Sequence, residues 1–199
     1  MATIGILVAA LPGHLNPLGA VGRELVRRGH RVIVATLPDG EPAVRLAGLD
    51  FAPIGGPEYP AGSLERVLAE LGRRRGASAF RHTIKLGVDL TRVILRDAPG
   101  ALSPYRPDLL LVDHALPGGN SLAERLRVPF VNVAGALAFY PDPDIPPNAT
   151  SWGPARSPLG RLRNRLALEA LRVMARPVVR LLAGYRREWG LPPRDHPRD

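Results

Sequence analysis

The stretch TIGILVAALPGHLNPLGAVGRELVRRGHRVIVAT, residues 3–36, places one amphipathic segment between two short apolar runs. The first run, residues 3–10, is continuous and of strand length, which is typical of a parallel strand covered on both faces. Asn16 and Pro17 then supply a helix N-cap and a proline for the first helical position. HRVIVAT, at the end of the stretch, is expected to form the second strand. Strand, helix and strand in this order predict a βαβ unit with a right-handed crossover.

The sequence continues this alternation as far as residue 139. Further helices are expected at residues 40–48, 63–75, 79–98 and 119–127. Further strands are expected at residues 50–54, 106–113 and 129–135. Residues 1–139 are therefore predicted to form one α/β domain, a doubly wound, Rossmann-like parallel sheet with helices on both faces.

Beyond this domain the composition changes. Residues 140–158 hold six prolines and are predicted to form a Pro-rich loop. Residues 159–190 are predicted to be a helical extension that packs on the same domain, broken or kinked at Pro177, and residues 191–199 a frayed tail. The extension is predicted from apolar side chains that recur as one helical stripe: Leu159, Leu162, Leu166, Ala170, Met174, Val178, Leu181, Tyr185 and Trp189.

The composition limits the class of protein. The 199 residues are 45% hydrophobic and include no cysteine, so we expect one domain without disulfides, thiolate catalysis or cysteine metal sites. No run approaches the roughly 18 to 20 uninterrupted apolar residues that a membrane span requires. The start has no basic residue ahead of its apolar run, which favours a first strand over a signal peptide. We therefore expect a cytoplasmic protein with no transmembrane segment.

The net charge of +9 raises the question of nucleic-acid binding. Residues 155–199 hold eleven arginines and four acidic residues, so most of the excess lies at one end of the chain. Such helices could meet a phosphate, an acidic partner or a membrane surface. The basic residues are almost all arginine, however, and no aromatic residues alternate with them in a recognisable nucleic-acid-binding module. A nucleic-acid partner is therefore not expected.

His14 is the first candidate functional residue. In an open parallel sheet, ligands bind beyond the carboxyl ends of the strands, and His14 lies there, after the first strand and just before the expected helix. A helix N-terminus disfavours an imidazolium, which keeps the ring neutral and able to take a proton. The alternative is that His14 only caps or fills the turn.

Asp113 is the second candidate, because it ends the strand at 106–113 and should project at the same edge. A carboxylate that accepts a hydrogen bond from one imidazole nitrogen stabilises the charge that appears when the other nitrogen takes a proton. Such a pair suits deprotonation of an alcohol. The alternative is an aspartate that caps the next turn. His114 is expected to point elsewhere, and a metal site of these three residues is not predicted, because no close-spaced ligand pair supports it.

Other chemistries lack their motifs. AALPGHLNP, residues 9–17, stands where a dinucleotide-binding fold requires G-x-G-x-x-G, and the chain has no G-x-x-x-x-G-K-[ST]. Ser121 lacks the G-x-S-x-G context of a hydrolase nucleophile. We therefore expect no cofactor and no bound metal.

Three segments carry a resemblance to a known family. PGHLNPLGAVGRELVRRGHRVIVAT at residues 12–36 resembles the start of the GT-B glycosyltransferases that use nucleotide sugars, in particular the bacterial branch acting on macrolides and carotenoids. RPDLLLVDHALPGGNSLAERLRVPFVNVAG at 106–135 and RLRNRLALEALRVMARPVVRLLAGYRREWGLPP at 161–193 resemble later parts of the N-terminal, acceptor-binding domain of that family, in the same order.

The resemblance implies an inverting transfer of a hexose from a UDP- or dTDP-sugar to a hydroxyl of a lipophilic small molecule. His14 falls on the general base of the family and Asp113 on the carboxylate that pairs with it. The nucleotide sugar is a co-substrate bound mostly by a second, C-terminal domain, whose donor motif is absent from this sequence. We therefore expect the acceptor-binding part, inactive without a donor domain in cis or in trans. The alternative is a non-catalytic small-molecule-binding or partner module.

The sequence does not specify the acceptor. Its pocket is expected to be lined by the loop at 55–62, the helices up to residue 98 and the segment 135–155. Aromatic and apolar side chains in or near these segments indicate an apolar ligand, and each could equally serve ordinary packing: Phe80, Leu137, Phe139, Tyr140 and Trp152.

Overall fold

The computed structural model describes residues 1–135, 141–147 and 150–194. These residues contain a five-stranded sheet in which every neighbouring pair is parallel, in the order β3-β2-β1-β4-β5. The strands are β1 (Thr3–Leu7), β2 (Arg31–Thr36), β3 (Asp50–Pro53), β4 (Leu109–Asp113) and β5 (Phe130–Val133). The predicted fold class, a doubly wound parallel α/β sheet, is confirmed.

The order of the strands creates one switch point. The chain runs outward from β1 to β2 and β3, then returns to the other side of β1 to form β4 and continues outward to β5. At the junction Ile4 lies opposite Leu109, and Leu7 lies opposite Val112. The connections that leave β1 and β4 therefore diverge toward opposite faces of the sheet, which is the arrangement that opens a ligand-binding crevice.

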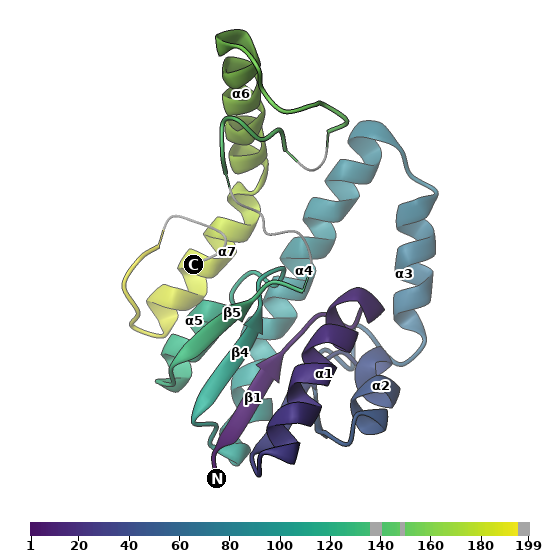
Figure 1. Ribbon diagram of the computed structural model, residues 1–199, viewed down its shortest axis with the longest axis vertical. Coiled ribbons are helices and arrows are strands. Elements are labelled where there is room, and N and C mark those ends of the chain that lie inside the picture. Colours follow the sequence, from purple (N-terminus) through teal and green to yellow (C-terminus); the bar gives the residue numbers. More distant parts are fainter. Residues whose placement is uncertain (136–140, 148–149, 195–199) are drawn as a thin grey trace.

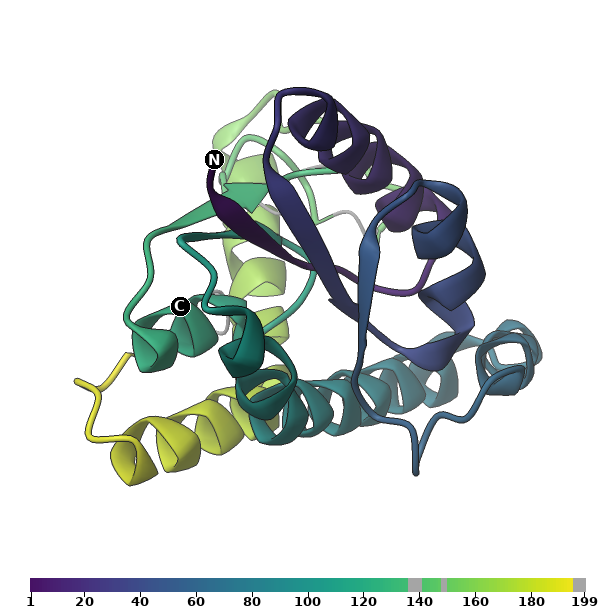
Figure 2. The same ribbon diagram turned by 90° about the horizontal axis from the view of Figure 1, so that it is seen from below.

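Helices cover both faces of the sheet. In Figure 2, α1 and α2 lie on one side of the strands, and α4, α5 and α7 lie on the other. Their bounds are α1 (Pro12–Arg27), α2 (Glu41–Leu46), α3 (Ser63–Gly72), α4 (Gly76–Leu102), α5 (Gly119–Leu126), α6 (Pro158–Met174) and α7 (Arg176–Glu188), with 3₁₀ turns η1 (Pro38–Gly40) and η2 (Ser103–Tyr105).

The core confirms that the sheet is covered on both faces. Ile6 and Leu7 are consecutive residues of β1, so their side chains point to opposite faces, and both have 0% exposure. From the α4 side, Ala98 and Leu102 are equally buried. That burial explains why α4 continues past Pro99 to Leu102, beyond its expected end at residue 98: packing against the sheet outweighs the one helical hydrogen bond that the proline removes.

The start of α1 differs from the expectation. The helix begins at Pro12, with Leu11 as its N-cap residue, and Asn16 is not the cap. The N–H groups of His14 and Leu15 already donate to the carbonyl of Leu11, over 2.9 and 2.8 Å. Pro12 thus takes the first helical position, where its fixed φ and missing N–H do no harm, and Pro17 lies inside the helix. His14 consequently belongs to the first helical turn rather than to the turn before it.

The C-terminal helical segment also corrects one expectation. The break near Pro177 is confirmed, because α6 ends at Met174 and α7 starts at Arg176. The stripe does not pack along its whole length, however. On α7, Val178 of the stripe is 5% exposed, and the fully covered leucine is Leu182, 3% exposed, rather than the predicted Leu181, which is half-buried. On α6, by contrast, apolar side chains of the stripe remain 40% to 78% exposed: Leu159, Leu162, Leu166 and Met174. Figure 1 shows the reason, since α7 lies beside α4 while α6 extends beyond the end of the sheet.

Candidate active site

Two polar residues meet where β1 and β4 end. Asp113 is the last residue of β4, and His14 lies in the first turn of the helix that follows β1. The Nδ1 atom of His14 is 2.8 Å from Oδ2 of Asp113. The structure therefore brings together the two residues predicted from the sequence, at the edge of the sheet where open α/β folds bind ligands.

The surroundings of His14 leave one of its nitrogens available. The Nδ1 contact has the distance of an ion pair without the alignment of a hydrogen bond, because the ring does not direct its N–H at the oxygen. Catalytic pairs often reach full alignment only when substrate binds. The side chain is 17% exposed and lies in the first turn of α1. With Nδ1 facing Asp113, Nε2 is the nitrogen that can take a proton from a ligand.

Asp113 is completely buried, and donors surround its carboxylate. The N–H of Ala9 donates to Oδ2 over 3.3 Å, and the N–H of Ala115 donates to Oδ1 over 3.1 Å. These hydrogen bonds offset the cost of removing the carboxylate from water. A buried carboxylate held in this way can orient His14 and stabilise a positive charge on it.

His114 does not point away from this pair, contrary to the expectation. Its Nδ1 atom lies 3.6 Å from Oδ1 of Asp113 and 3.3 Å from the carbonyl oxygen of Val133, and its side chain is 11% exposed. The expectation rested on the alternation of side chains along a strand. Because β4 ends at Asp113, His114 belongs to the following turn, where that alternation no longer holds.

An apolar pocket of about 80 Å³ lies beside the backbone that hydrogen-bonds Asp113, although neither His14 nor Asp113 lines it. It begins at residues 8–11, which include the Ala9 that hydrogen-bonds Asp113. Its other walls are apolar side chains of α3, α4 and the loops after the strands, including Leu64, Leu68, Leu86 and Leu90. No polar surface lines this pocket.

The predicted acceptor-binding residues are not gathered in this pocket. Phe80 lies on α4 and is half-buried, but it is not among the lining side chains. Trp152 is 40% exposed, and the guanidinium of Arg163 lies 4.5 Å from the centre of its ring. Leu137, Phe139 and Tyr140 lie outside the described residues. The role of all five residues in acceptor binding stays a prediction. The lining leucines of α3 were not singled out, because their spacing is that of an ordinary amphipathic helix.

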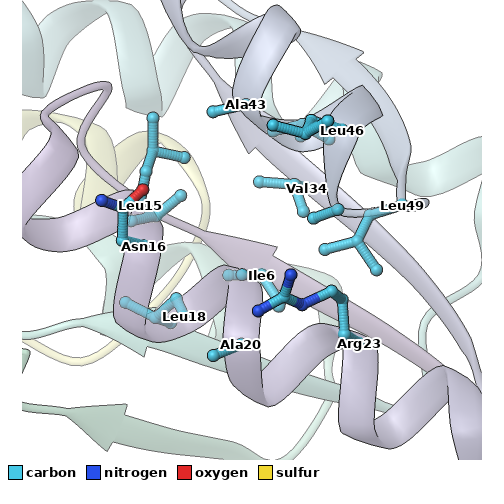
Figure 3. A pocket seen from close by; sticks show the side chains of 14 residues that line it. Ile6, Leu15, Asn16, Leu18, Ala20, Arg23, Val34, Ala43, Leu46 and Leu49 are labelled. Carbon is cyan, nitrogen blue, oxygen red and sulfur yellow. The ribbon is translucent and has the colours of Figure 1, made fainter.

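A larger hollow, of about 170 Å³, lies between α1 and α2 (Figure 3). Its walls are mostly apolar, and Asn16 and Arg23 contribute polar groups. Like the smaller pocket, it is lined by neither His14 nor Asp113. The smaller pocket is the better candidate because Ala9, one of its lining residues, donates its backbone N–H to Asp113.

Other kinds of site find no support in the described ranges. They contain no group of three or more histidine, aspartate or glutamate side chains arranged to hold a metal ion. Ser121 is fully buried and accepts a hydrogen bond from Arg186 over 2.8 Å, a structural arrangement rather than that of an exposed nucleophile. None of the described helices combines the length and the apolar character needed to cross a bilayer.

Comparison with known proteins gives a consistent set of relatives, although no family model matches the chain. The chain is 29% identical over 181 residues to a zeaxanthin glucosyltransferase of Pantoea ananas, covering 91% of this chain and 42% of that enzyme. It is 27% identical over 194 residues to the 4'-demethylrebeccamycin synthase of Lentzea aerocolonigenes, covering 94% of this chain and 46% of that enzyme. The chain thus spans less than half the length of these curated relatives.

Solved structures show the same fold. The calicheamicin glycosyltransferase CalG4 superposes with a TM-score of 0.65 at 22% identity, covering 99% of this chain and 44% of that one. The glycosyltransferase SsfS6 of Streptomyces sp. SF2575, complexed with thymidine diphosphate, superposes with a TM-score of 0.61 at 22% identity, covering 96% of this chain and 46% of that one.

Proposed function

Because the chain is a homologue of these glycosyltransferases and superposes on less than half of a solved glycosyltransferase, we propose that it is the acceptor-binding part of an inverting glycosyltransferase. Residues 1–139 with the helical extension at 159–190 would form the acceptor-binding domain. The donor, a UDP- or dTDP-sugar, would be bound by a donor domain in cis or in trans. The acceptor would be a lipophilic small molecule that carries a hydroxyl group.

The arrangement of His14 and Asp113 is the observation that carries this proposal. Nε2 of His14 takes the proton from the acceptor hydroxyl, while the hydroxyl oxygen forms a bond to the anomeric carbon of the hexose. The bond from that carbon to the diphosphate oxygen breaks on the opposite side, and the nucleoside diphosphate leaves with the electron pair. Asp113 holds the ring through Nδ1 and stabilises the imidazolium that results.

The pocket supports an apolar acceptor. Its walls present no polar surface, so the part of the ligand that it holds is apolar, and the hydroxyl would have to lie outside the pocket to reach His14. The volume of about 80 Å³ holds only part of a carotenoid-like or sterol-like molecule. The remainder of such an acceptor would extend out of the pocket.

Glycosyl transfer in a reconstituted enzyme tests the proposal. The chain is joined to, or mixed with, the donor domain of one of its relatives, and product is measured from UDP-glucose or dTDP-glucose with zeaxanthin, a sterol and a simple phenol. We expect product that depends on His14, with His30→Ala as a matched control at the opposite edge of the sheet.

The chain alone should bind a lipophilic alcohol weakly and transfer no sugar. Without a site for the donor, the advantage of holding both reactants together, about 7 to 11 kcal/mol, is lost. His14-dependent product from the chain alone would show that no donor domain is needed. Binding of the alcohol without transfer in any reconstituted form would instead favour a non-catalytic binding module.

A further inference from the structure

The helix α6 has its apolar side turned outward. Asn164 is the buried residue of this helix, and its side-chain N–H₂ donates to the carbonyl of Pro143 over 2.9 Å. The loop at 141–147 therefore lies against the face that carries Asn164. The opposite face presents large apolar side chains, 40% to 78% exposed: Leu159, Leu162, Leu166, Val173 and Met174. A surface helix normally turns its apolar face inward, so this outward face is suited to a partner.

The apolar face of α6 is continuous. Residues 159–174 span about 22 Å of helix at the usual rise per residue. Ile145 and Trp152, in the segment before the helix, are a further 58% and 40% exposed. Elsewhere in the described ranges, large apolar side chains with such exposure are scattered over several elements, which is normal for a protein surface: Met1, Val21, Val26, Leu46, Leu68 and Val131.

Arginines border this apolar face. The charged residues of α6 are four arginines and one glutamate: Arg161, Arg163, Arg165, Arg172 and Glu169. Arg161, Arg165 and Arg172 are exposed and, by their helical spacing, lie along one border of the face. On the other border, the guanidinium of Arg163 lies 4.5 Å from the centre of the Trp152 ring. The face is therefore apolar in its middle and positively charged at its edges, with a tryptophan beside it.

This charge pattern favours one kind of partner. A second copy of the chain would bring the arginines of two α6 helices together, and repulsion between like charges opposes that contact. An anionic bilayer offers negative headgroups to the arginines and an apolar interior to the leucines. Helices that lie in the plane of a membrane interface combine these same features, arginine on the polar side and leucine on the other, and tryptophan is enriched at the depth of the headgroups.

We propose that α6, together with Trp152, binds the surface of an anionic lipid bilayer. The helix lies parallel to the membrane, with its leucines at the boundary of the acyl chains and its arginines at the lipid phosphates. Figure 1 shows α6 beyond the end of the sheet toward which β1 runs, and His14 and Asp113 lie at that end. This placement would bring the candidate active site close to lipophilic molecules dissolved in the bilayer. The binding itself does not depend on glycosyl transfer.

Co-sedimentation with lipid vesicles tests the proposal. The 199-residue chain is titrated with vesicles of phosphatidylcholine alone and of phosphatidylcholine mixed with an equal amount of phosphatidylglycerol, at low and at high salt. We expect binding to the anionic vesicles at low salt to be at least tenfold tighter than to the neutral ones, and to weaken as salt is added. In Trp189→Phe, which leaves Trp152 as the remaining tryptophan, fluorescence should shift to shorter wavelength on binding.

Matched variants locate the contact on α6. Leu166→Gln should weaken binding about tenfold, because one leucine no longer enters the bilayer. Its control is Leu46→Gln on α2, where the leucine is 88% exposed, and this variant should bind as the wild type does. Arg165→Gln should weaken binding about fivefold, whereas Arg23→Gln makes the same change of charge on α1 and should have little effect. All four side chains are exposed, so we expect each variant to fold.

Three results would overturn the proposal. The first is no binding of the wild type to anionic vesicles at low salt. The second is binding that Leu166→Gln and Arg165→Gln leave unchanged, or reduce no more than their controls do. The third is a dimer, detected by sedimentation velocity, that Leu166→Gln dissociates, because the face would then belong to a second copy.

Two further measurements separate this inference from the proposed function. His14→Ala should bind vesicles as the wild type does, so a protein that never transfers sugar could still confirm the membrane contact. The enzyme reconstituted with a donor domain should also bind the anionic vesicles. Loss of vesicle binding on addition of the donor domain would show that this domain covers α6, and would overturn the proposal for the complete enzyme.

Discussion

Two buried charged groups, Arg186 and Asp113, show how differently this molecule uses charge. Arg186 of α7 is 1% exposed and directs each arm of its guanidinium at an acceptor. Nη1 donates to Ser121 over 2.8 Å, Nη2 donates to Glu124 over 2.8 Å, and Nε donates to the carbonyl of Pro192 over 2.7 Å. This network joins α7 to α5, and each of the three guanidinium nitrogens donates to one acceptor in it.

Asp113 is equally buried, but its main partner is an imidazole that is not fully aligned with it and that keeps a second nitrogen for a ligand. It also lies at the switch point of the sheet and beside an apolar pocket, whereas Arg186 lies between helices that cover the sheet. The Arg186 network, in which each nitrogen has an acceptor, stabilises the fold. The His14–Asp113 pair, in which Nε2 remains available at the ligand-binding edge of the sheet, is suited to chemistry. Substitutions can test this distinction.

His14→Ala should have the largest effect, and it should fall on activity. Loss of a general base lowers turnover by about 10²- to 10⁴-fold, and a partly exposed residue in a first helical turn contributes little to packing. Turnover and acceptor binding are measured in the reconstituted enzyme, together with thermal unfolding. Full turnover in this variant would return His14 to the alternative role of filling the turn.

Arg186→Leu should show the opposite pattern. Removing one partner of a buried pair leaves Glu124 without the guanidinium that faces it, at a cost of about 3 kcal/mol in the free energy of unfolding. Such a removal typically costs about 3 to 5 kcal/mol, and we expect the lower figure because Glu124 retains its contact with Arg194. Turnover of the folded fraction should be unchanged. Arg187→Leu, at an exposed position of the same helix, is the control and should change stability by less than about 0.5 kcal/mol in urea unfolding.

Leu182→Ala and Leu166→Ala compare the covered helix α7 with the exposed helix α6. Leu182 is 3% exposed in the small core with Leu95 and Val178, so its truncation should cost about 2 to 4 kcal/mol. Leu166 is 64% exposed, and its truncation should stay within about 0.5 kcal/mol. Equal losses in denaturant unfolding would show that α6 packs in solution as α7 does.

Asp113→Asn should reduce turnover less than His14→Ala, by about tenfold to a hundredfold, because orientation and charge stabilisation are lost while the base remains. The same rate measurement compares the two variants. A greater loss in Asp113→Asn than in His14→Ala would show that Asp113 acts through more than the imidazole.

Asp97 should give the smallest effect, a dependence of stability on acid pH. The side chain of Arg96 lowers the pKa of Asp97, and its carboxylate accepts the N–H of Gly55 over 2.8 Å. Since the folded pKa lies below the unfolded one, about 3.9, this stabilisation is present above that pH and is lost as the pH falls through the folded value. Asp97→Asn should lower Tm at pH 7, and the decrease should become smaller as the pH falls below about 3.9. An equal decrease in Tm at neutral and at acid pH would contradict this account.

The sequence alone determined the class of fold and the edge of the sheet on which the reactive groups lie. Apolar runs of strand length that alternate with helical periodicity permit little other than a covered parallel sheet, because both faces of each strand require burial. The same pattern placed His14 after one strand and Asp113 at the end of another. The sequence predicted the ends of the elements less well than their existence. A proline suits the first position of a helix, and Pro12 and Pro17 both fit that position; only the backbone hydrogen bonds to Leu11 show that α1 begins at Pro12.

The tertiary structure alone determined which residues that are distant in the sequence come into contact. The 2.8 Å approach of His14 and Asp113 requires β4 to insert beside β1, a long-range pairing that no local pattern encodes. The approach of His114 requires β5 to place the Val133 carbonyl beside it. The stripe on α6 and α7 has one periodicity throughout, yet only α7 is covered, because burial depends on whether another element lies against the helix. Periodicity specifies which face of an element is apolar, whereas the packing of distant segments specifies whether that face is buried.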